Sequence, residues 1–457
     1  MGVRNLAGFR GTVVWRGEDT YERTRRAMLW NGWKPDRYPE LIARATSTDD
    51  VVRAVRFAVR SGLRVAVRGG GHSWCGSPVR DGMLLDLSGL GGIAVDASAR
   101  TASIRPATSN RELAATLTAH GLSFPVGHGG DVPASGYLLA GGIGWNSRVL
   151  GPACRSVREV EVVTADGEVV RANSRENPEL FWAARGAGPG FPGAVTRFEI
   201  DLHPLPAAMT ASTHVYALAD LDAVAEFAAE LCPRLPAQAE PGLLLAPSPE
   251  GVAPQPEGRV VILSATAFTD TAGDAAAALA PLESCPAAGR ALLRRSGTPT
   301  SFASLYGVSS GLWPPGRRYA ADTAWSGADL REVLSRCHKA VSTAPSSGSL
   351  VLVTPDPLPD DAATAPDMAF SMRDRVLVSC YAIWQGAVGD KSNNAWLRAA
   401  MAELEPVTTG HYVAEADLPA APSRAARSFS EPSWRRIEEL RARVDPDGVF
   451  HTYLGHG

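Results

Sequence analysis

The sequence carries no excess of positive charge and very few lysines. Its 457 residues include 45 Lys and Arg against 48 Asp and Glu, which gives a formal net charge of −3. Binding to the phosphate backbone of DNA or RNA depends on a concentrated positive field, so we expect no nucleic-acid partner. Only Lys34, Lys339 and Lys391 are lysines, and we assign no function to this shortage.

Cysteine is also sparse and follows no motif. The six cysteines are scattered, with no CxxC pair. Neither they nor His128, His338 and His411 have the spacing of metal ligands. We therefore predict no metal site and no disulfide framework.

Long apolar runs are absent, and the first 15 residues lack the apolar core of a signal peptide. These features predict a cytoplasmic protein with no membrane partner. With 45% hydrophobic residues over 457 positions, the chain has enough material for a large core and for two or three domains.

A strand followed by glycines is the most informative stretch of the chain. The run of Val65, Ala66 and Val67 predicts a buried strand, and Arg68 and three glycines at positions 69–71 end it. Glycines let a backbone approach a ligand closely, and His72 follows them as the first reactive side chain. The alternative is a loose loop with an ordinary surface histidine.

This stretch resembles the covalent-flavin segment of the berberine-bridge-enzyme-like FAD oxidases of the vanillyl-alcohol-oxidase superfamily. The resemblance rests on the sequence RGGGHS at residues 68–73 and on GMLLDLSGL at residues 82–90. It implies a PCMH-type FAD-binding domain in which His72 is bonded to the 8α-methyl of the flavin.

A second glycine-rich region, residues 125–154, has too many glycines for a helix interior and too much apolar content for a solvated linker. We interpret it as a buried loop around a ligand, and by the resemblance it wraps the flavin. Gly129 stands where many relatives have a cysteine bonded to flavin C6. Cys154 matches a different family position and Cys75 is better explained as a small buried residue, so a second link to the flavin is not expected.

Residues 176–204 contain several glycines that suggest a dinucleotide fingerprint. They come after a predicted helix and before a predicted strand, whereas a Rossmann fingerprint requires the reverse order. By the resemblance this segment closes the FAD domain. The cofactor-binding residues that the resemblance implies are Arg68, Gly69, Gly70, Gly71, His72, Ser73, Gly130, Asp131, Ser135, Gly136, Gly141, Gly142, Gly144, Trp145 and Val195.

Periodicity and turn residues predict the elements in order. In the first half these are a helix over 15–33, a strand over 39–45, a helix capped within 47–50, a hairpin over 93–104, a helix capped by Asn110, a hairpin over 160–170, a helix over 178–184 and a strand over 194–202. In the second half they are strands over 259–267, 350–354 and 376–384, helices over 219–231, 395–404 and 434–450, and loops over 233–258 and 344–366.

The predicted fold class is α+β. It consists of a PCMH-type FAD-binding domain of two α+β subdomains and an α+β substrate domain whose antiparallel sheet is covered by helices on one face. The expected boundaries are residues 1–205 for the FAD domain, 206–409 for the substrate domain and 410–457 for a C-terminal return to the FAD domain.

Hydride transfer to a flavin requires a substrate C–H bond held against the ring and often a base for the departing proton. Tyr412 matches the first tyrosine of the family's Y-V-N-Y segment, and Glu415 stands in place of the second. Glu415 is a candidate base with a raised pKa, or a solvated residue at the rim. Tyr381 and Gln385 are the other catalytic candidates, with sheet packing and a loop amide as the alternatives.

The function predicted from the resemblance is an FAD-linked oxidase that takes hydride from an alcohol, sugar or secondary metabolite and is reoxidised by O2. Two alternatives stay open, a flavin-dependent dehydrogenase or cyclase of natural-product biosynthesis and a flavin-free binding protein. The sequence leaves the substrate and the oligomeric state undecided.

Overall fold

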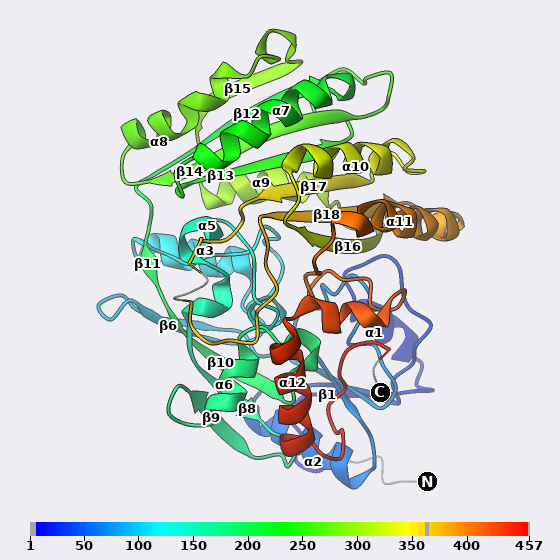
Figure 1. Cartoon of the computed structure of the whole chain (residues 1–457). Helices are drawn as coiled ribbons and strands as arrows, with labels where there is room; N and C mark the ends of the chain where they lie inside the picture. The colour runs from blue at the N-terminus through cyan, green and yellow to red at the C-terminus, as the bar shows by residue number, and fades with distance from the viewer. Residues whose placement is uncertain (1–5, 362–364, 456–457) are drawn as a thin grey trace.

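The computed structural model describes residues 6–361 and 365–455. Its lower half in Figure 1 contains a mixed four-stranded sheet in the order β1-β2-β4-β3. Three of these strands run parallel and are almost wholly buried, as their continuous apolar sequences require. The strands are β1 (Thr12–Trp15), β2 (Leu41–Arg44), β3 (Val65–Arg68) and β4 (Met83–Asp86).

Helix α2 (Thr48–Arg60) connects β2 to β3 and begins as predicted. Ser47 accepts a hydrogen bond from the backbone N–H of Asp50, which satisfies one free donor of the first turn. The apolar side chains of Val51 and Val55 pack against Leu41 and Leu85 of the sheet in one buried cluster. This βαβ unit places His72 in the loop that follows the carboxyl end of β3.

A second, five-stranded antiparallel sheet follows in the order β5-β6-β10-β8-β9. Both predicted hairpins are confirmed, and α3 (Asn110–Ala119) and α6 (Pro178–Ala184) pack beside the sheet. A short pair of strands, β7 (Leu122–Ser123) and β11 (His203–Pro204), adjoins it. The five strands are β5 (Ile93–Asp96), β6 (Thr101–Ile104), β8 (Val157–Val163), β9 (Val169–Asn173) and β10 (Ala194–Asp201).

The upper half of Figure 1 is an antiparallel seven-stranded sheet in the order β15-β12-β14-β13-β17-β18-β16. Its strands are β12 (Ala208–Ala217), β13 (Ala239–Ala246), β14 (Val260–Thr269), β15 (Leu293–Pro299), β16 (Arg318–Ser326), β17 (Leu350–Pro355) and β18 (Val376–Trp384). Four helices lie along its upper face in the figure, namely α7 (Leu221–Leu231), α8 (Ala272–Leu279), α10 (Leu330–Ser342) and α11 (Asp390–Leu404). The other face looks toward α9 (Phe302–Leu312) and the lower half, so the predicted α+β class with a helix-covered antiparallel sheet is confirmed.

The last part of the chain returns to the lower half. Helix α12 (Glu431–Val444) lies in front of α6 in Figure 1, and the guanidinium of Arg436 contacts the Glu179 carboxylate at 2.7 Å. Beyond it, Phe450 forms a parallel bridge with Val65 at the start of β3. The C-terminal segment thereby fixes the strand that leads to His72.

Several predicted elements are wrong, and tertiary contacts explain most of the differences. The helix expected over 15–33 is only α1 (Tyr21–Ala27), because Arg25 turns inward to the carbonyl oxygens of Pro35 and Arg37 and holds the chain beyond it in an irregular path. Asn110 does not cap α3; Ser109 does, while the Asn110 amide donates to the Val132 carbonyl.

Two segments expected to be loops contain regular structure. Residues 233–258 include β13, whose Pro241 and Gly242 lie within a strand paired on both sides. The glycine-rich region 125–154 includes two short helices, α4 (Ala134–Leu139) and α5 (Ser147–Leu150).

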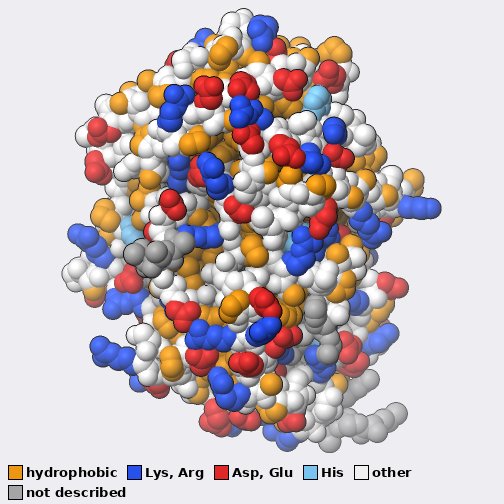
Figure 2. Space-filling view, viewed as in Figure 1, with side chains coloured by type: hydrophobic (Ala, Val, Ile, Leu, Met, Phe, Trp, Pro, Cys, Tyr) orange, Lys and Arg blue, Asp and Glu red, His pale blue; other side chains and the backbone are white. Residues whose placement is uncertain are grey.

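The surface shows no field of one sign on the face in view. Figure 2 shows acidic and basic side chains interspersed over both halves of the molecule. Within the described residues, no helix is long and apolar enough to cross a bilayer, and no group of three or more His, Cys, Asp and Glu side chains is placed to hold a metal ion.

Candidate active site

A cavity of about 470 Å³ lies between the two halves of the molecule. Its size is within the range of small-molecule and cofactor sites. The cavity wall combines residues from segments that are far apart in the sequence, drawn from 65–78, 127–140, 188–195, 309–315, 412–415 and 450–452, with Trp30, Ile143, Leu352 and Tyr381.

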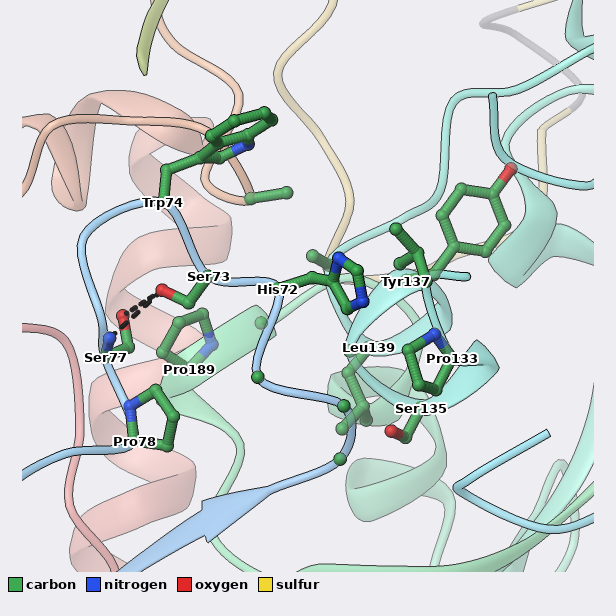
Figure 3. A pocket seen from close by; sticks show the side chains of 18 of the residues that line it. His72, Ser73, Trp74, Ser77, Pro78, Pro133, Ser135, Tyr137, Leu139 and Pro189 are labelled. Atoms are coloured by element: carbon green, nitrogen blue, oxygen red, sulfur yellow. Dashed lines mark hydrogen bonds between the residues drawn. The ribbon is translucent and has the colours of Figure 1, made fainter. Parts of the chain in front are cut away.

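His72 projects from the loop after β3 into this cavity. In Figure 3 its ring lies beside Pro133 and Leu139 of the second glycine-rich segment. Burial lowers the pKa of His72 to about 4, and the charge of Asp131 opposes this only in part. The imidazole is therefore neutral near pH 7, with a free electron pair for nucleophilic attack or bond formation.

The three glycines before His72 are required by packing within the protein. A Cβ atom on Gly69 would lie 2.0 Å from the Ser135 hydroxyl oxygen, and one on Gly70 would lie 2.2 Å from the Pro133 ring. Gly71 has φ +74°, and a Cβ there would lie 2.1 Å from the Met28 carbonyl oxygen. From the sequence we expected these glycines to let a ligand approach the backbone. The structure shows that they are needed for the loop to pack against α4 and the N-terminal segment.

Arg68 and Ser73 border the cavity but have partners inside the loop. The Arg68 guanidinium contacts Asp86 at 2.7 Å and donates to the carbonyl oxygens of Met28 and Gly70. The Ser73 hydroxyl is bonded to Ser77, as the dashed lines in Figure 3 show. Both side chains therefore shape the loop that carries His72.

The remaining predicted cofactor residues divide into two groups. Gly130, Asp131, Ser135, Gly136 and Val195 line the cavity. The hydroxyl oxygen of Ser135 is buried and has no hydrogen-bond partner in the described part of the chain. An unpartnered buried hydroxyl in the cavity wall fits a polar ligand atom.

The second group lies behind the cavity wall and comprises Gly141, Gly142, Gly144 and Trp145. A Cβ on Gly141 would meet Phe370, and one on Gly142 or Gly144 would meet Tyr137. The Trp145 ring packs on Tyr306 at 4.8 Å between centroids. These four residues support the cavity wall from the core and do not line the cavity. The prediction that they contact the cofactor directly is therefore not supported by their positions.

The cysteines occupy different surroundings. Gly129 and Cys75 line the cavity, and the Cys75 sulfur lies 3.2 Å from the Ser77 hydroxyl. Cys154 is buried outside the cavity, and burial raises the pKa of its thiol to about 12. A neutral thiol at that depth is inert.

Three of the four catalytic candidates meet in the cavity. The Tyr381 hydroxyl on β18 donates to Glu415 at 2.8 Å, and burial raises the pKa values of both groups. The hydroxyl oxygen of Tyr412 accepts the backbone N–H of Gly142 at 3.1 Å, and burial also raises its pKa. Tyr412 is therefore protonated near neutral pH.

Gln385 does not belong to this group. It lies exposed just beyond β18, and its amide oxygen accepts a hydrogen bond from Arg317. β18 ends at Trp384, so the next residue is carried past the end of the sheet, away from the cavity.

Sequence reasoning missed much of the aromatic lining. Trp30 stacks on His72 with centroids 5.5 Å apart, and Trp313, after α9, packs on Tyr381 at 5.4 Å. Tyr137 and His128 also line the cavity. Nothing in the local sequence around Trp30 or Trp313 marks these contacts, because they form between segments tens of residues apart.

Comparisons with known proteins agree with this geometry. Residues 39–173 match the family described as FAD binding domain. The chain is 31% identical over 437 residues to the FAD-linked oxidoreductase ptmO of Penicillium ochrochloron, covering 95% of this chain and 94% of that protein. It is 36% identical over 202 residues to (R)-6-hydroxynicotine oxidase of Paenarthrobacter nicotinovorans, covering 44% and 43%.

Solved structures share the fold over almost the whole chain. The 6-hydroxy-D-nicotine oxidase of Arthrobacter nicotinovorans superposes with a TM-score of 0.85 at 22% identity, covering 98% of each chain. Berberine bridge enzyme of Eschscholzia californica superposes with a TM-score of 0.81 at 19% identity, covering 97% of this chain and 96% of that one.

Proposed function

The chain belongs to the berberine-bridge-like FAD-linked oxidoreductases with a PCMH-type fold, and we propose that it holds FAD through a covalent bond to His72 and oxidises a small organic molecule. The observation that carries this proposal is the position of His72. Its neutral imidazole projects into the cavity from a loop that allows no side chain at the three preceding positions. A nucleophile of this kind is what attachment at the flavin 8α-methyl requires.

The residues of the cavity wall fit such a cofactor. Ser135 offers a buried hydroxyl without a partner, and Gly130, Gly136 and Val195 leave an adjoining wall free of large side chains. With Gly129 and a buried Cys154, we propose a single histidyl link and no second bond to cysteine.

FAD supplies the chemistry of hydride acceptance, and we propose that O2 then takes the electrons and leaves as hydrogen peroxide. The chain's own groups orient the substrate. The Tyr412 hydroxyl is protonated, and its oxygen accepts a hydrogen bond from the backbone N–H of Gly142. The Tyr381 hydroxyl already donates its proton to Glu415. Tyr412 is thus the hydroxyl that is able to donate to a substrate atom.

We further propose a division of labour along the chain. Residues 1–205 hold the flavin, 206–409 supply the substrate side of the cavity and 410–457 return to the flavin side. This is supported by the placement of β12 to β18 in one sheet and by the contacts of α12 and Phe450 with the first half.

The test is the fate of yellow colour on acid precipitation of purified protein. We expect the wild type to retain flavin in the pellet and His72→Ala to release it to the supernatant, because no other side chain is proposed to form the bond. His120→Ala, at an exposed position of the helix-capping turn, is the matched control and keeps its flavin. Release of flavin from the wild type would refute the covalent link, and absence of flavin from the wild type would refute the assignment of the cofactor.

A further inference from the structure

Glu415 is a buried carboxylate surrounded by neutral donors. The Tyr381 hydroxyl donates a hydrogen bond to it at 2.8 Å, and the side chains of Ser379 and Trp74 are close enough to lower its pKa against the effect of burial. Among residues 6–361 and 365–455, no arginine, lysine or histidine contributes to its electrostatic surroundings. A buried negative charge without a cationic partner is costly, so burial raises the pKa of Glu415, and a cation bound beside the carboxyl would stabilise its ionised form.

Aromatic rings surround the same part of the cavity. Trp74 packs on Tyr381 with centroids 5.2 Å apart, Trp313 packs on Tyr381 from another side, and Trp30 meets Trp74 at 5.6 Å. We call these four rings, which all line the cavity together with Glu415, the aromatic pocket. Aromatic faces carry partial negative charge and attract cations that have left water.

The other charged groups of the cavity do not change this balance. Arg68 is paired with Asp86 at 2.7 Å, and Asp131, whose side chain is 81% exposed, is paired with Arg111. Burial lowers the pKa values of the three histidines of the cavity wall, His72, His128 and His451, to about 4, so all three are neutral near pH 7. Once ionised, Glu415 therefore gives the aromatic pocket a negative charge that these side chains do not offset.

We propose that the aromatic pocket binds an organic amine in its positively charged form, with Glu415 as the counter-ion. This rests on the proposed function, because it names the substrate class for the same cavity. Trp30 touches both His72 and Trp74, so an ammonium group held at Glu415 keeps the attached carbon atoms beside the flavin attachment point.

The contacts of Glu415 favour an amine cation over a neutral alcohol. A carboxylate has about four acceptor positions, and the Tyr381 hydroxyl already occupies one of them. A neutral hydroxyl gains only a further hydrogen bond at this carboxyl. A cation gains Coulomb energy from the ionised carboxylate as well, and its alkyl groups contact the rings.

The experiment compares two ligands of the same shape that differ in charge. They are (3-hydroxyphenyl)trimethylammonium, which is a permanent cation, and 3-tert-butylphenol, which is neutral. Affinities for the purified protein with its flavin are measured by titration calorimetry. We expect the cation to bind the wild type at least about tenfold more tightly than the phenol.

Glu415→Gln keeps the shape of the side chain and removes its charge. We expect this variant to bind the cation at least about tenfold more weakly than the wild type does, and to bind the phenol with an affinity unchanged within about twofold. Glu405→Gln is the matched control, because this glutamate is exposed and lies ten positions earlier beside Arg427. It should keep the full preference for the cation.

Equal affinity of the two ligands for the wild type would overturn the inference without any variant. An equal loss of affinity for both ligands in Glu415→Gln would also overturn the inference, since it would indicate that Glu415 has a structural role. Flavin content is measured on the same samples. Missing flavin contradicts the proposed function, whereas the two ligands still report on the aromatic pocket, so the two failures are distinguishable.

Discussion

The two sides of the cavity are built from opposite kinds of residue. The side formed by residues 69–72 and 130–136 is rich in glycine. A Cβ atom at positions 69–71 or 130 would collide with a neighbouring group, and His72 is the reactive side chain. The side formed by the seven-stranded sheet and residues 412–415 consists of large side chains, among them Tyr381, Tyr412 and Glu415.

This difference matches two tasks. A cofactor shared by a whole family presents the same atoms each time, so a backbone surface of fixed shape serves it. Substrates differ between relatives, and side chains on a sheet can change without disturbing the strands that carry them. The comparison predicts that changes on the glycine side alter flavin retention, and that changes on the aromatic side alter ligand preference.

The largest effect is expected where residues 410–424, which we call the strap, are fixed to the sheet. Arg424 contacts Asp322 of β16 at 2.7 Å, and the Asp322 side chain is only 1% exposed. Arg424→Met leaves that carboxylate buried without its partner and should lower the free energy of unfolding by about 3–5 kcal/mol in urea titrations at pH 8.

The control for this change is Arg427→Met, which breaks an exposed pair with Glu405. It should cost about 0–1 kcal/mol, because solvent screens such pairs. Equal losses in the two variants would show that the buried pair does not anchor the strap. Burial raises the pKa of Asp322 to about 7, so the loss in Arg424→Met should shrink at acidic pH, where the carboxyl takes up a proton.

The next effect tests the glycine side. Gly71 and Gly62 both have positive φ, +74° and +64°, but a Cβ on Gly62 meets nothing within 4 Å. Gly62→Ala should therefore cost about 1 kcal/mol from backbone conformation alone, and Gly71→Ala about 3 kcal/mol because of the added collision with the Met28 carbonyl.

Thermal unfolding and flavin retention measure this pair. Gly71→Ala should lose covalent flavin and keep the preference of the aromatic pocket for the cationic ligand. If the two alanine variants behave alike, or if Gly71→Ala alters the ligand preference alone, the division between the two sides is wrong.

The last effect is expected where the two halves of the molecule meet outside the cavity. Glu240 of β13 accepts the backbone N–H of Arg148 at 3.0 Å, and burial raises the pKa of Glu240 from 4.5 to about 7. A carboxyl whose folded pKa is raised adds stability below its unfolded pKa and loses that contribution as the pH rises to its folded pKa.

The unfolding free energy of the wild type relative to Glu240→Gln should therefore fall between pH 4.5 and 7, by up to about 3 kcal/mol. Glu250→Gln, at an exposed loop position, is the control and should show no such slope. A flat difference between wild type and Glu240→Gln would mean that Glu240 is ionised across the whole range.

Local sequence was sufficient where the interactions that fix the structure are local. Ser47 begins α2 by bonding to a donor three residues away, and the turn at Asp166 and Gly167 joins paired strands, so both were predictable. The loop predicted over 233–258 was wrong because β13 forms by pairing with β14 and β17, and this pairing overrides the low strand propensity of Pro241 and Gly242.

The candidate site divides in the same way. The sequence by itself determined that a strand ends in glycines followed by His72, because β-branched residues and glycine fix the backbone there. Only the tertiary structure decided that Glu415 lies beside Tyr381 and Trp74, that Trp30 stacks on His72, and that Gln385 faces solvent. These contacts join segments tens to hundreds of residues apart, and their free energy comes from packing and burial that no local pattern encodes.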